Sequence, residues 1–318
     1  MVKVEEERML EETIKISRRA GFSVYLPELS GRYCFDISIR KEDLLVFIKV
    51  AFNIDCIPES LAMELKLISK NLDGSSLIVG HKTRGGPMED DVIYERYEIP
   101  AINLETLKHV LIEDWPPIIY AGRGGYYVKI NGPLLRALRE ERKLSLGDIA
   151  NYVGVSRRAI YEYERGNMAA TVETAIRLEE LFDVPVAMPL GIFDRNYQVK
   201  LKHIRRPKNP LEELFLQRMI EWGMRTFLTN YAPFDALSKS GRKGTEEEKM
   251  IAGIEKKETR KEIELRGEVL SKLSKMIEAT AIFLTRKRGL YLDGVIILTP
   301  KELSNIKTKN QLKEMIDR

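Results

Sequence analysis

The stretch from residue 134 to residue 185 constrains the fold of this chain more than any other part of the sequence. Its apolar residues recur at helical spacing in four short runs, and glycines follow two of these runs, at positions 154 and 166. Glycine adopts positive φ without strain, so it favours a tight turn at the end of a short helix. The pattern predicts short, closely connected helices that bury their apolar faces against one another.

The helix starts in this stretch are predicted by capping residues. Ser156 is a good N-cap for a helix from Arg157 to Arg165, and Thr171 for the helix that follows. The expected apolar faces are Leu134, Leu135, Leu138 and Leu144 in the first helix, Ile149, Ala150 and Val153 in the second, and Ala175, Leu178, Leu181 and Phe182 in the fourth.

A short helix, a glycine turn and another short helix form a helix-turn-helix, in which the helix after the turn enters the major groove. Ala150 suits this arrangement, because a large side chain there would hold the two helices apart. The whole stretch resembles the Cro/repressor-type (XRE) helix-turn-helix family. The resemblance implies an all-α, five-helix domain that binds double-stranded DNA at specific sequences.

The position of each residue in that motif implies its role at DNA. Arg157, Arg158 and Glu162 would face base edges, because a guanidinium donates to guanine O6 and N7 and a carboxylate accepts from cytosine N4. Each arginine could instead contact a phosphate or stay solvated. The DNA-binding residues implied by the motif are Ser156, Arg157, Arg158, Tyr161, Glu162, Arg165 and Asn167, with the last two and Tyr161 at the phosphate backbone. Ile160 and Tyr163 are expected in the core.

One position departs from the family pattern. Many family members open the second helix with a polar side chain that binds a phosphate, and this chain has Leu146 there. A basic linker without acidic residues, at positions 198–209, could supply the missing affinity through Lys200, Lys202, Arg205 and Arg206. A linker that is merely solvated is the alternative.

The residues before the helix-turn-helix alternate between β-rich runs and amphipathic helices. The expected order is a helix over Glu5–Ala20, three strands, a helix near Glu59–Leu72, a strand at Ser76–Val79, a strand near Val92–Ile102 and a helix from Leu104. This order is typical of an α/β or α+β domain. A hairpin with its turn at Gly122–Gly125 leads into the central domain.

The residues after 211 repeat the pattern of the first domain. Phe35-Asp36 is matched by Phe234-Asp235, and the helix face Leu65, Ile68, Leu72 by Leu270, Leu273, Ile277. The sequence therefore predicts a multi-domain chain with two similar α/β domains around the helical one, although shared strand-helix order is common to many α/β domains. The expected boundaries are 1–128, 129–190, a basic linker 191–210, and 211–318.

Both flanking domains resemble the restriction-endonuclease fold. Active members hold Mg²⁺ with an aspartate and the glutamate of a Glu-x-Lys motif, whose lysine orients water. In the first domain Asp36 and Lys49 match this pattern, but Phe47 takes the place of the glutamate. One carboxylate would then have to hold the metal alone.

The second domain has Asp235, followed by Glu255 and Lys257 in a densely charged segment where such a spacing also arises by chance. We interpret both domains as non-catalytic scaffolds for dimerisation or for sensing another molecule. The alternative is a structure-selective or resolvase-like nuclease targeted by the helix-turn-helix, with Asp36 and Lys49, or Asp235, Glu255 and Lys257, as its site.

Composition narrows the remaining possibilities. The 52 basic and 48 acidic residues leave a formal charge of only +4, which disfavours a purely electrostatic nucleic-acid binder. Two cysteines and three histidines without ligand spacing favour neither a disulfide framework nor a zinc site. No cofactor and no metal are expected. The chain has no apolar run long enough to span a membrane, and a soluble, cytoplasmic protein is expected.

The three domains together resemble a group of archaeal helix-turn-helix transcriptional regulators that carry a Cro-type domain in the middle of the chain. The resemblance implies sequence-specific DNA binding and control of transcription. Since one helix-turn-helix contacts few base pairs, a homodimer on a pseudo-palindromic operator is expected. The flanking domains could also recruit another protein or a small effector.

Overall fold

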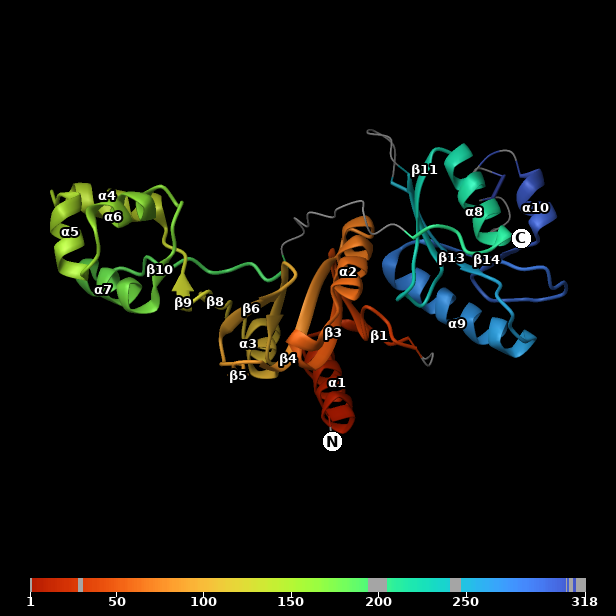
Figure 1. Cartoon of the computed structure of the whole chain (residues 1–318), viewed down its shortest axis with the longest axis horizontal. Coiled ribbons are helices and arrows are strands. Elements are labelled where there is room, and N and C mark those ends of the chain that lie inside the picture. The colour runs from red at the N-terminus through yellow and green to blue at the C-terminus, as the bar shows by residue number, and fades with distance from the viewer. Residues whose placement is uncertain are drawn as a thin grey trace. The chain divides into compact units, whose positions relative to one another are not determined.

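The computed structural model describes residues 2–27, 31–193, 205–240, 247–306, 308 and 311–312 (Figure 1). The chain forms two compact units, and each of them draws on separate stretches of sequence. The first unit comprises Met1–Ala20, Ala51–Cys56 and Leu77–Asp194, and the second comprises Gly21–Val50, Ile57–Ser76 and Arg195–Arg318.

The first unit begins with a long amphipathic helix and ends with a helical bundle. Its elements are α1 (Val2–Arg19), η1 (Ile54–Cys56), β4 (Ser75–Thr83, from Leu77 on), β5 (Gly86–Pro87), β6 (Val92–Arg96), β7 (Ile99–Ile102), α3 (Leu104–Ile112), β8 (Ile119–Gly122), β9 (Gly125–Val128), α4 (Gly132–Glu141), α5 (Leu146–Val153), α6 (Arg157–Glu164), β10 (Ala170–Thr171) and α7 (Val172–Phe182).

Strand pairing in the first unit leads from the α/β part to the bundle. β7 is parallel to β4 and antiparallel to β6, and β8 runs parallel to β6. β8 and β9 form the expected hairpin across Gly122 and Gly125. β9 then pairs with β10, so Val128 lies opposite Ala170 and the bundle is tied to the hairpin by a short antiparallel ladder.

The bundle of α4–α7 has a core of its own, which Figure 1 shows as a set of short helices around one interior. Most of the apolar residues predicted to face inward do so: the buried ones are Leu135, Ile149, Ala150, Val153, Ala175, Leu178 and Phe182, and Leu134, Leu138, Leu144 and Leu181 pack against them. Two expectations need correction. The described residues of this bundle form four α-helices, not five, and α4 ends at Glu141, so Leu144 lies in the turn that follows.

The second unit contains two groups of elements from distant parts of the sequence. Its first group, called here the N-terminal part, has β1 (Ser23–Tyr25), β2 (Ile37–Lys41), β3 (Leu44–Asn53, up to Val50) and α2 (Glu59–Asn71). Its second group, the C-terminal part, has α8 (Pro210–Glu221), β11 (Met224–Leu228), β12 (Ala236–Ser240), β13 (Lys249–Ile254), α9 (Arg260–Ile277), β14 (Thr280–Leu284), β15 (Ile296–Leu298) and α10 (Pro300–Asn305).

The C-terminal part is a five-stranded sheet in the order β11-β12-β13-β14-β15, with helices on both faces (Figure 1). Alternate residues of a strand face opposite sides of a sheet. Met250, Ala252 and Ile254 therefore pack with Phe215 of α8, while Gly253 between them lies against Leu270 of α9. A β-carbon at Gly253 would lie 2.7 Å from a methyl carbon of Leu270, so only glycine lets α9 approach β13 this closely.

The elements of the two flanking regions follow the same order. α1, β1, β2, β3, α2, β4, β7 and α3 correspond in sequence order to α8, β11, β12, β13, α9, β14, β15 and α10. The pairings also agree where both members lie in one unit: β1-β2-β3 and β11-β12-β13 are antiparallel, and β4-β7 and β14-β15 are parallel. The region expected to form one strand at Val92–Ile102 forms two, β6 and β7. β7 corresponds to β15, whereas β6 has no counterpart among the described strands of the C-terminal part.

Within the second unit the two parts pack against each other reciprocally. α2 lies against β12, and α9 lies against β1. Asp73 at the end of α2 binds Lys239 of β12, with 2.8 Å between Oδ1 and Nζ. At the corresponding places, Glu278 at the end of α9 binds Arg40 of β2 at 2.6 Å.

Backbone groups complete this contact. The buried carboxylate of Glu64 in α2 accepts hydrogen bonds from the amides of Asn230 and Tyr231, at 2.9 Å and 2.5 Å for the shortest of each. The amide of Cys34 donates to the carbonyl of Tyr231 at 2.6 Å, and the Tyr25 hydroxyl donates to the carbonyl of Val269 at 3.1 Å. Within the second unit, the N-terminal and C-terminal parts thus form an intramolecular pair. Among the described residues no helix is long and apolar enough to cross a membrane.

Candidate nucleic-acid interface

The turn between α5 and α6 has the geometry of a helix-turn-helix. Gly154 follows α5 with φ at +77°, in the left-handed region that favours glycine. Ser156 then caps α6, and its hydroxyl accepts from the amide of Ala159 at 3.1 Å. At the start of α5, Ser145 and Asp148 form a capping box, a pair that the sequence analysis missed although its Ser-x-x-acid spacing is visible.

α6 has a buried face and an exposed face. Ile160 and Tyr163 lie in the core of the bundle, as expected from their positions in the motif. Arg157, Arg158 and Tyr161 are exposed, and 45% of the Tyr161 surface is accessible. The exposed face of α6 therefore presents two adjacent guanidinium groups near its N-terminus and a phenol one turn later.

Two arginines of the bundle, Arg139 and Arg142, join α4 to α6 and to α7. Arg139 of α4 binds Glu164 through both carboxylate oxygens, with 2.5 Å from Nε to Oε1 and 3.1 Å from Nη2 to Oε2. Arg142, which follows α4, donates to the carbonyls of Leu181 and Phe182 at the end of α7. A bidentate pair fixes orientation as well as distance, so the Arg139–Glu164 pair positions α6 in the bundle. The sequence analysis missed both arginines, because each partner lies more than twenty positions away.

The other residues expected at DNA are exposed but have contacts within the protein. Arg165 donates to the Tyr161 hydroxyl at 3.2 Å and stacks over its ring. The amide of Asn167 donates to a carboxylate oxygen of Glu162 at 2.9 Å, so that oxygen already has one partner. Arg157 lies near the first turn of α5, where its Cδ would be 3.6 Å from a β-carbon at Gly147.

The structure separates the linker residues. Lys200 and Lys202 lie outside the described residues. Arg205 is buried: it binds both carboxylate oxygens of Glu212, at 2.6 Å and 2.9 Å, and donates to the carbonyl of Thr229. Its guanidinium is thus committed to the start of α8 and is not free for a phosphate, contrary to the expectation from the sequence. Arg206 is exposed.

The endonuclease-like residues of the first domain occupy a small polar site at the start of β2. Asp36 accepts from the Lys49 ammonium at 2.8 Å and from the Val50 amide at 2.6 Å, through different oxygens. Lys49 also donates to the Tyr33 carbonyl. Phe47, in the position of the glutamate, is fully buried with its ring edge-on to Phe35. Both Asp36 oxygens therefore have protein partners, and the place of the second carboxylate belongs to the core.

Asp235 repeats the backbone geometry of Asp36. The Asp36 amide donates to the Ile48 carbonyl, and the Val50 amide donates back to the Asp36 carboxylate. In the same way, the Asp235 amide donates to the Ala252 carbonyl, and the Ile254 amide donates back to Asp235 Oδ2. The residue that corresponds to Lys49 is therefore Gly253. The sequence match of Asp235 to Glu255 and Lys257 was wrong in register.

Different cations replace that lysine around Asp235. Lys256 lies 2.8 Å from Asp235 Oδ1, and Arg266 of α9 donates to Oδ2 while also binding Glu258. Burial opposes ionisation of Asp235, but the charges of Arg266 and Lys256 outweigh it and lower the pKa of the carboxyl. The carboxylate is held in the folded protein by two basic side chains.

Glu255 has partners elsewhere. One of its carboxylate oxygens accepts from the Thr285 hydroxyl and from the Arg286 amide. Lys257 is exposed. Within the described part of the chain, no three Asp, Glu, His or Cys side chains come together as metal ligands. Neither flanking site thus fits the paired carboxylates that hold Mg²⁺ in active members of the endonuclease fold.

Comparison with known proteins agrees with two of the three expected domains. A PD-(D/E)XK superfamily domain matches residues 6–117, and a helix-turn-helix domain matches residues 135–188. These matches confirm the helix-turn-helix resemblance and the endonuclease-fold resemblance of the first flanking region, and the resemblance of the region after residue 211 stays a prediction. No solved structure matches the chain.

Several archaeal proteins match over nearly the whole length. A "Putative HTH-type transcriptional regulatory protein" of Thermococcus gammatolerans is 38% identical over 99% of this chain and 97% of its own length. A protein of that name from Thermococcus kodakarensis is 36% identical over 99% of this chain and 96% of its own, and one from Methanococcoides burtonii is 31% identical over 97% and 95%. This chain therefore belongs to the archaeal family of proteins that carry the name HTH-type transcriptional regulatory protein.

Proposed function

We propose that this protein is a sequence-specific DNA-binding regulator of transcription whose helix α6 contacts base edges in the major groove. The observation that carries the proposal is the exposed pair Arg157 and Arg158 in the first turn of α6, on the face opposite Ile160 and Tyr163. Arginine is the side chain best suited to guanine O6 and N7. The printed names of the relatives support control of transcription as the outcome of DNA binding.

Phosphate contacts in the proposal come from residues at the end of α6. Arg165 stacks on Tyr161, which holds its guanidinium at the surface of the bundle. Arg206 and the lysines at 200 and 202 would add sequence-independent affinity. Arg205 is left out, because Glu212 neutralises it within the protein. Ser156 would act through its cap on α6 and Asn167 through its bond to Glu162.

The test starts from a bound sequence selected from random duplexes with the full-length protein. Arg157→Ala and Arg158→Ala should each weaken binding to that site by roughly 1–3 kcal/mol and relax the preference at one base pair. Arg165→Ala should weaken binding to all duplexes about equally and flatten the salt dependence. Arg136→Ala is the matched control, since Arg136 is an exposed arginine of the same bundle on α4. Unchanged specific binding in both α6 variants would exclude base contacts by this helix.

The regulator is proposed to act as a homodimer. One chain supplies one helix-turn-helix, and dimers of such domains bind half-sites about 34 Å apart. Since α2 and α9 are already packed within one chain, the dimer would use other surfaces. Light scattering should give twice 36.6 kDa, and a footprint should protect two major grooves on one face of DNA. A monomer both alone and on DNA would contradict the dimer.

A nuclease remains the second candidate, and the match of residues 6–117 to the PD-(D/E)XK superfamily supports it. The contacts of Asp36 and Phe47 argue against it, because a single carboxylate whose two oxygens already accept hydrogen bonds from the protein is a poor Mg²⁺ site. Purified protein with Mg²⁺ or Mn²⁺ should leave duplex and branched DNA intact. Cleavage that disappears in Asp36→Ala or Asp235→Ala would favour the nuclease instead.

A further inference from the structure

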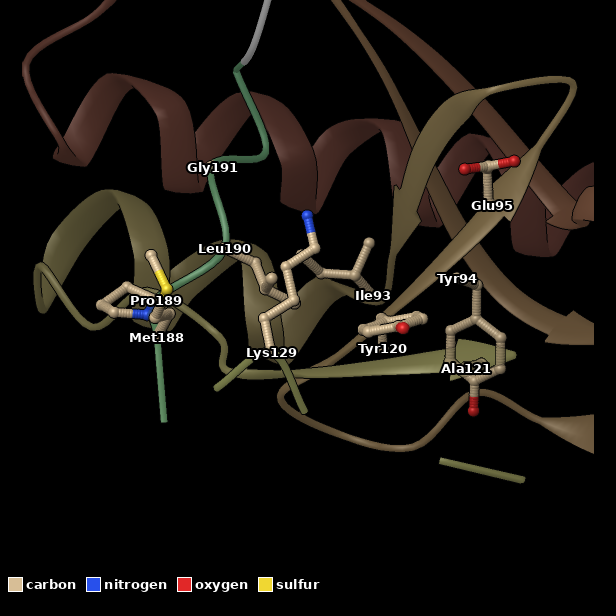
Figure 2. Close-up of a pocket in the computed structure, with 10 residues that line it drawn as sticks. All are labelled: Ile93, Tyr94, Glu95, Tyr120, Ala121, Lys129, Met188, Pro189, Leu190 and Gly191. Atoms are coloured by element: carbon tan, nitrogen blue, oxygen red, sulfur yellow. The ribbon is translucent and has the colours of Figure 1, made fainter. Parts of the chain in front are cut away.

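A cavity of about 510 Å³ lies in the first unit, beside the segment that leaves the helix-turn-helix bundle (Figure 2). Its volume is in the range of small-molecule sites. The residues that line it include Tyr94, Glu95, Tyr120, Lys129, Met188 and Leu190. They come from β6, from β8, from the residue after β9, and from the chain after α7.

The wall that Met188 and Leu190 contribute is held by backbone hydrogen bonds. The Met188 amide donates to the Lys129 carbonyl at 2.8 Å, and the Leu190 amide donates to the Pro117 carbonyl at 2.9 Å. Ala187 forms a β-bridge with Ile130 just before. The residues that follow the bundle are therefore fastened to the strands of the pocket, so a molecule in the pocket touches the connection on which the position of the bundle depends.

Tyr120 gives the pocket a flat aromatic surface, on the same face of the sheet as Ile93, its register partner on β6. In Figure 2 the side chain of Lys129 lies next to the Tyr120 ring, whereas the side chain of Tyr94 points in the opposite direction to that of Lys129. The Tyr94 hydroxyl is bonded to Tyr126 and to the amide of Glu89, and burial together with the bond to Tyr126 raises the pKa of Tyr94 to about 12. Tyr94 is thus held against Tyr126 on the face of the sheet opposite Tyr120. Rings and a methionine thioether are the surfaces on which a planar ligand stacks.

Three polar side chains of the pocket, those of Lys129, Tyr120 and Glu95, have no hydrogen-bond or ion-pair partner among the residues that the structure describes. Elsewhere on this protein, lysines and glutamates form many close pairs, such as Lys108 with Glu105. A cation, a hydroxyl and a carboxylate without protein partners around one open pocket are arranged for a ligand with a matching anion and N–H donor.

From this arrangement we infer that the pocket binds a planar heteroaromatic anion. The ring packs on Tyr120 beside Met188 and Leu190, the anionic group binds Lys129, and a ring N–H or amino group donates to Glu95. Indole acids and purine nucleotides share this chemistry. Because the pocket holds the exit segment of the bundle, its ligand acts as an effector of DNA binding, a consequence that rests on the proposed function.

Calorimetry on the full chain tests binding without DNA. The probes are indole-3-acetate and adenosine monophosphate, with indole-3-acetamide and adenosine as neutral counterparts. At least one anion should bind at one site per chain, and its neutral counterpart should bind roughly tenfold more weakly, as expected for loss of one charge-assisted hydrogen bond. Binding of indole-3-acetate would indicate an indole acid as the ligand, and binding of adenosine monophosphate would indicate a purine nucleotide. Binding of neither, or equal binding of the neutral compounds, would overturn the inference.

Variants place the ligand in this pocket. Lys129→Gln should weaken binding of the anion about tenfold, and Tyr120→Leu should weaken it further by removing the ring. Arg123→Gln is the matched control, since it removes an exposed cation from the β8–β9 turn outside the pocket lining. Equal affinities of Lys129→Gln and Arg123→Gln would locate the ligand elsewhere and overturn the proposal.

The effector role has a separate readout. The ligand that binds should shift the affinity of the wild-type protein for its selected DNA site, and Lys129→Gln should abolish the shift at the same ligand concentration. If the ligand binds but DNA affinity is unchanged, the effector role is wrong and the binding site stands. If the protein binds no DNA at all, the proposed function fails, while calorimetry still decides the pocket.

Discussion

The carboxylate of Asp73 binds the ammonium of Lys239 at 2.8 Å across 166 positions of sequence. Glu278 and Arg40 form the corresponding pair. Each acid follows the helix after the third strand of its α/β region, and each base lies on the second strand. Both acids also have positive φ, +56° and +53°. The two copies of the fold thus exchange equivalent contacts, as the subunits of a symmetric dimer do.

This exchange predicts unequal coupling in the two pairs. Lys239 is nearly buried, whereas Glu278 is largely exposed, and an exposed pair is screened by solvent. A double-mutant cycle of Asp73→Asn and Lys239→Gln should give a coupling of about 0.5–1 kcal/mol in urea unfolding, and a cycle of Glu278→Gln and Arg40→Gln about 0–0.5 kcal/mol. Equal or reversed couplings would contradict the role of burial.

Glu64 is expected to carry more of this contact than either ion pair. Glu64→Ala leaves the amides of Asn230 and Tyr231 without their acceptor and should lower the free energy of unfolding by about 1–3 kcal/mol. Glu64→Gln keeps an acceptor oxygen and should cost less. Glu59→Ala, at the exposed start of the same helix, should cost below about 1 kcal/mol. A loss no larger in Glu64→Ala than in Glu59→Ala would show that the contact does not stabilise the unit.

The ion pairs of Asp235 should make part of the free energy of unfolding depend on pH in the acid range. Its pKa in the folded protein lies below the ordinary value of 3.8, because Arg266 and Lys256 outweigh the effect of burial. An aspartate of this kind stabilises the folded state above the unfolded pKa, and the contribution is lost as the pH falls through the lower, folded pKa. In urea unfolding, the gap between wild type and Asp235→Asn should be large at pH 7 and 5 and should shrink below pH 3.8. A gap that is the same at every pH would refute this.

α4 packs so closely against α6 that a side chain at Gly132 has no room. A β-carbon at Gly132 would lie 2.4 Å from the carbonyl oxygen of Glu164 and 2.6 Å from that of Tyr163, both backbone atoms of α6. Gly132→Ala must therefore displace α6 and should cost about 1–3 kcal/mol, with weaker DNA binding. Gly147→Ala, in α5, is the control for stability, since the added carbon would lie 3.4 Å from Ser145 Oγ and 3.6 Å from the Arg157 side chain and should stabilise the helix by up to about 1 kcal/mol. Two variants of equal stability would show that α4 and α6 are not closely packed at Gly132.

The sequence by itself determined the helix-turn-helix and the order of elements in both flanking regions. Ser156, Gly154 and Thr171 act on backbone groups within a few residues of themselves, so their spacing predicts where helices begin and end. The Phe-Asp pairs at 35–36 and 234–235 are likewise local marks of a strand start. Such signals do not depend on the remainder of the chain.

Only the tertiary structure decided which residues meet. Strand register places Gly253, and not Lys257, opposite Asp235, in the position that Lys49 has opposite Asp36. The pairing of β12 with β13 fixes this register through hydrogen bonds between strands. Arg205 looked like a DNA contact in a basic linker and is instead neutralised by Glu212. Asp73 and Lys239 meet because two copies of one fold pack face to face. Contacts of this kind depend on the packing of whole elements, and no short stretch of sequence encodes them.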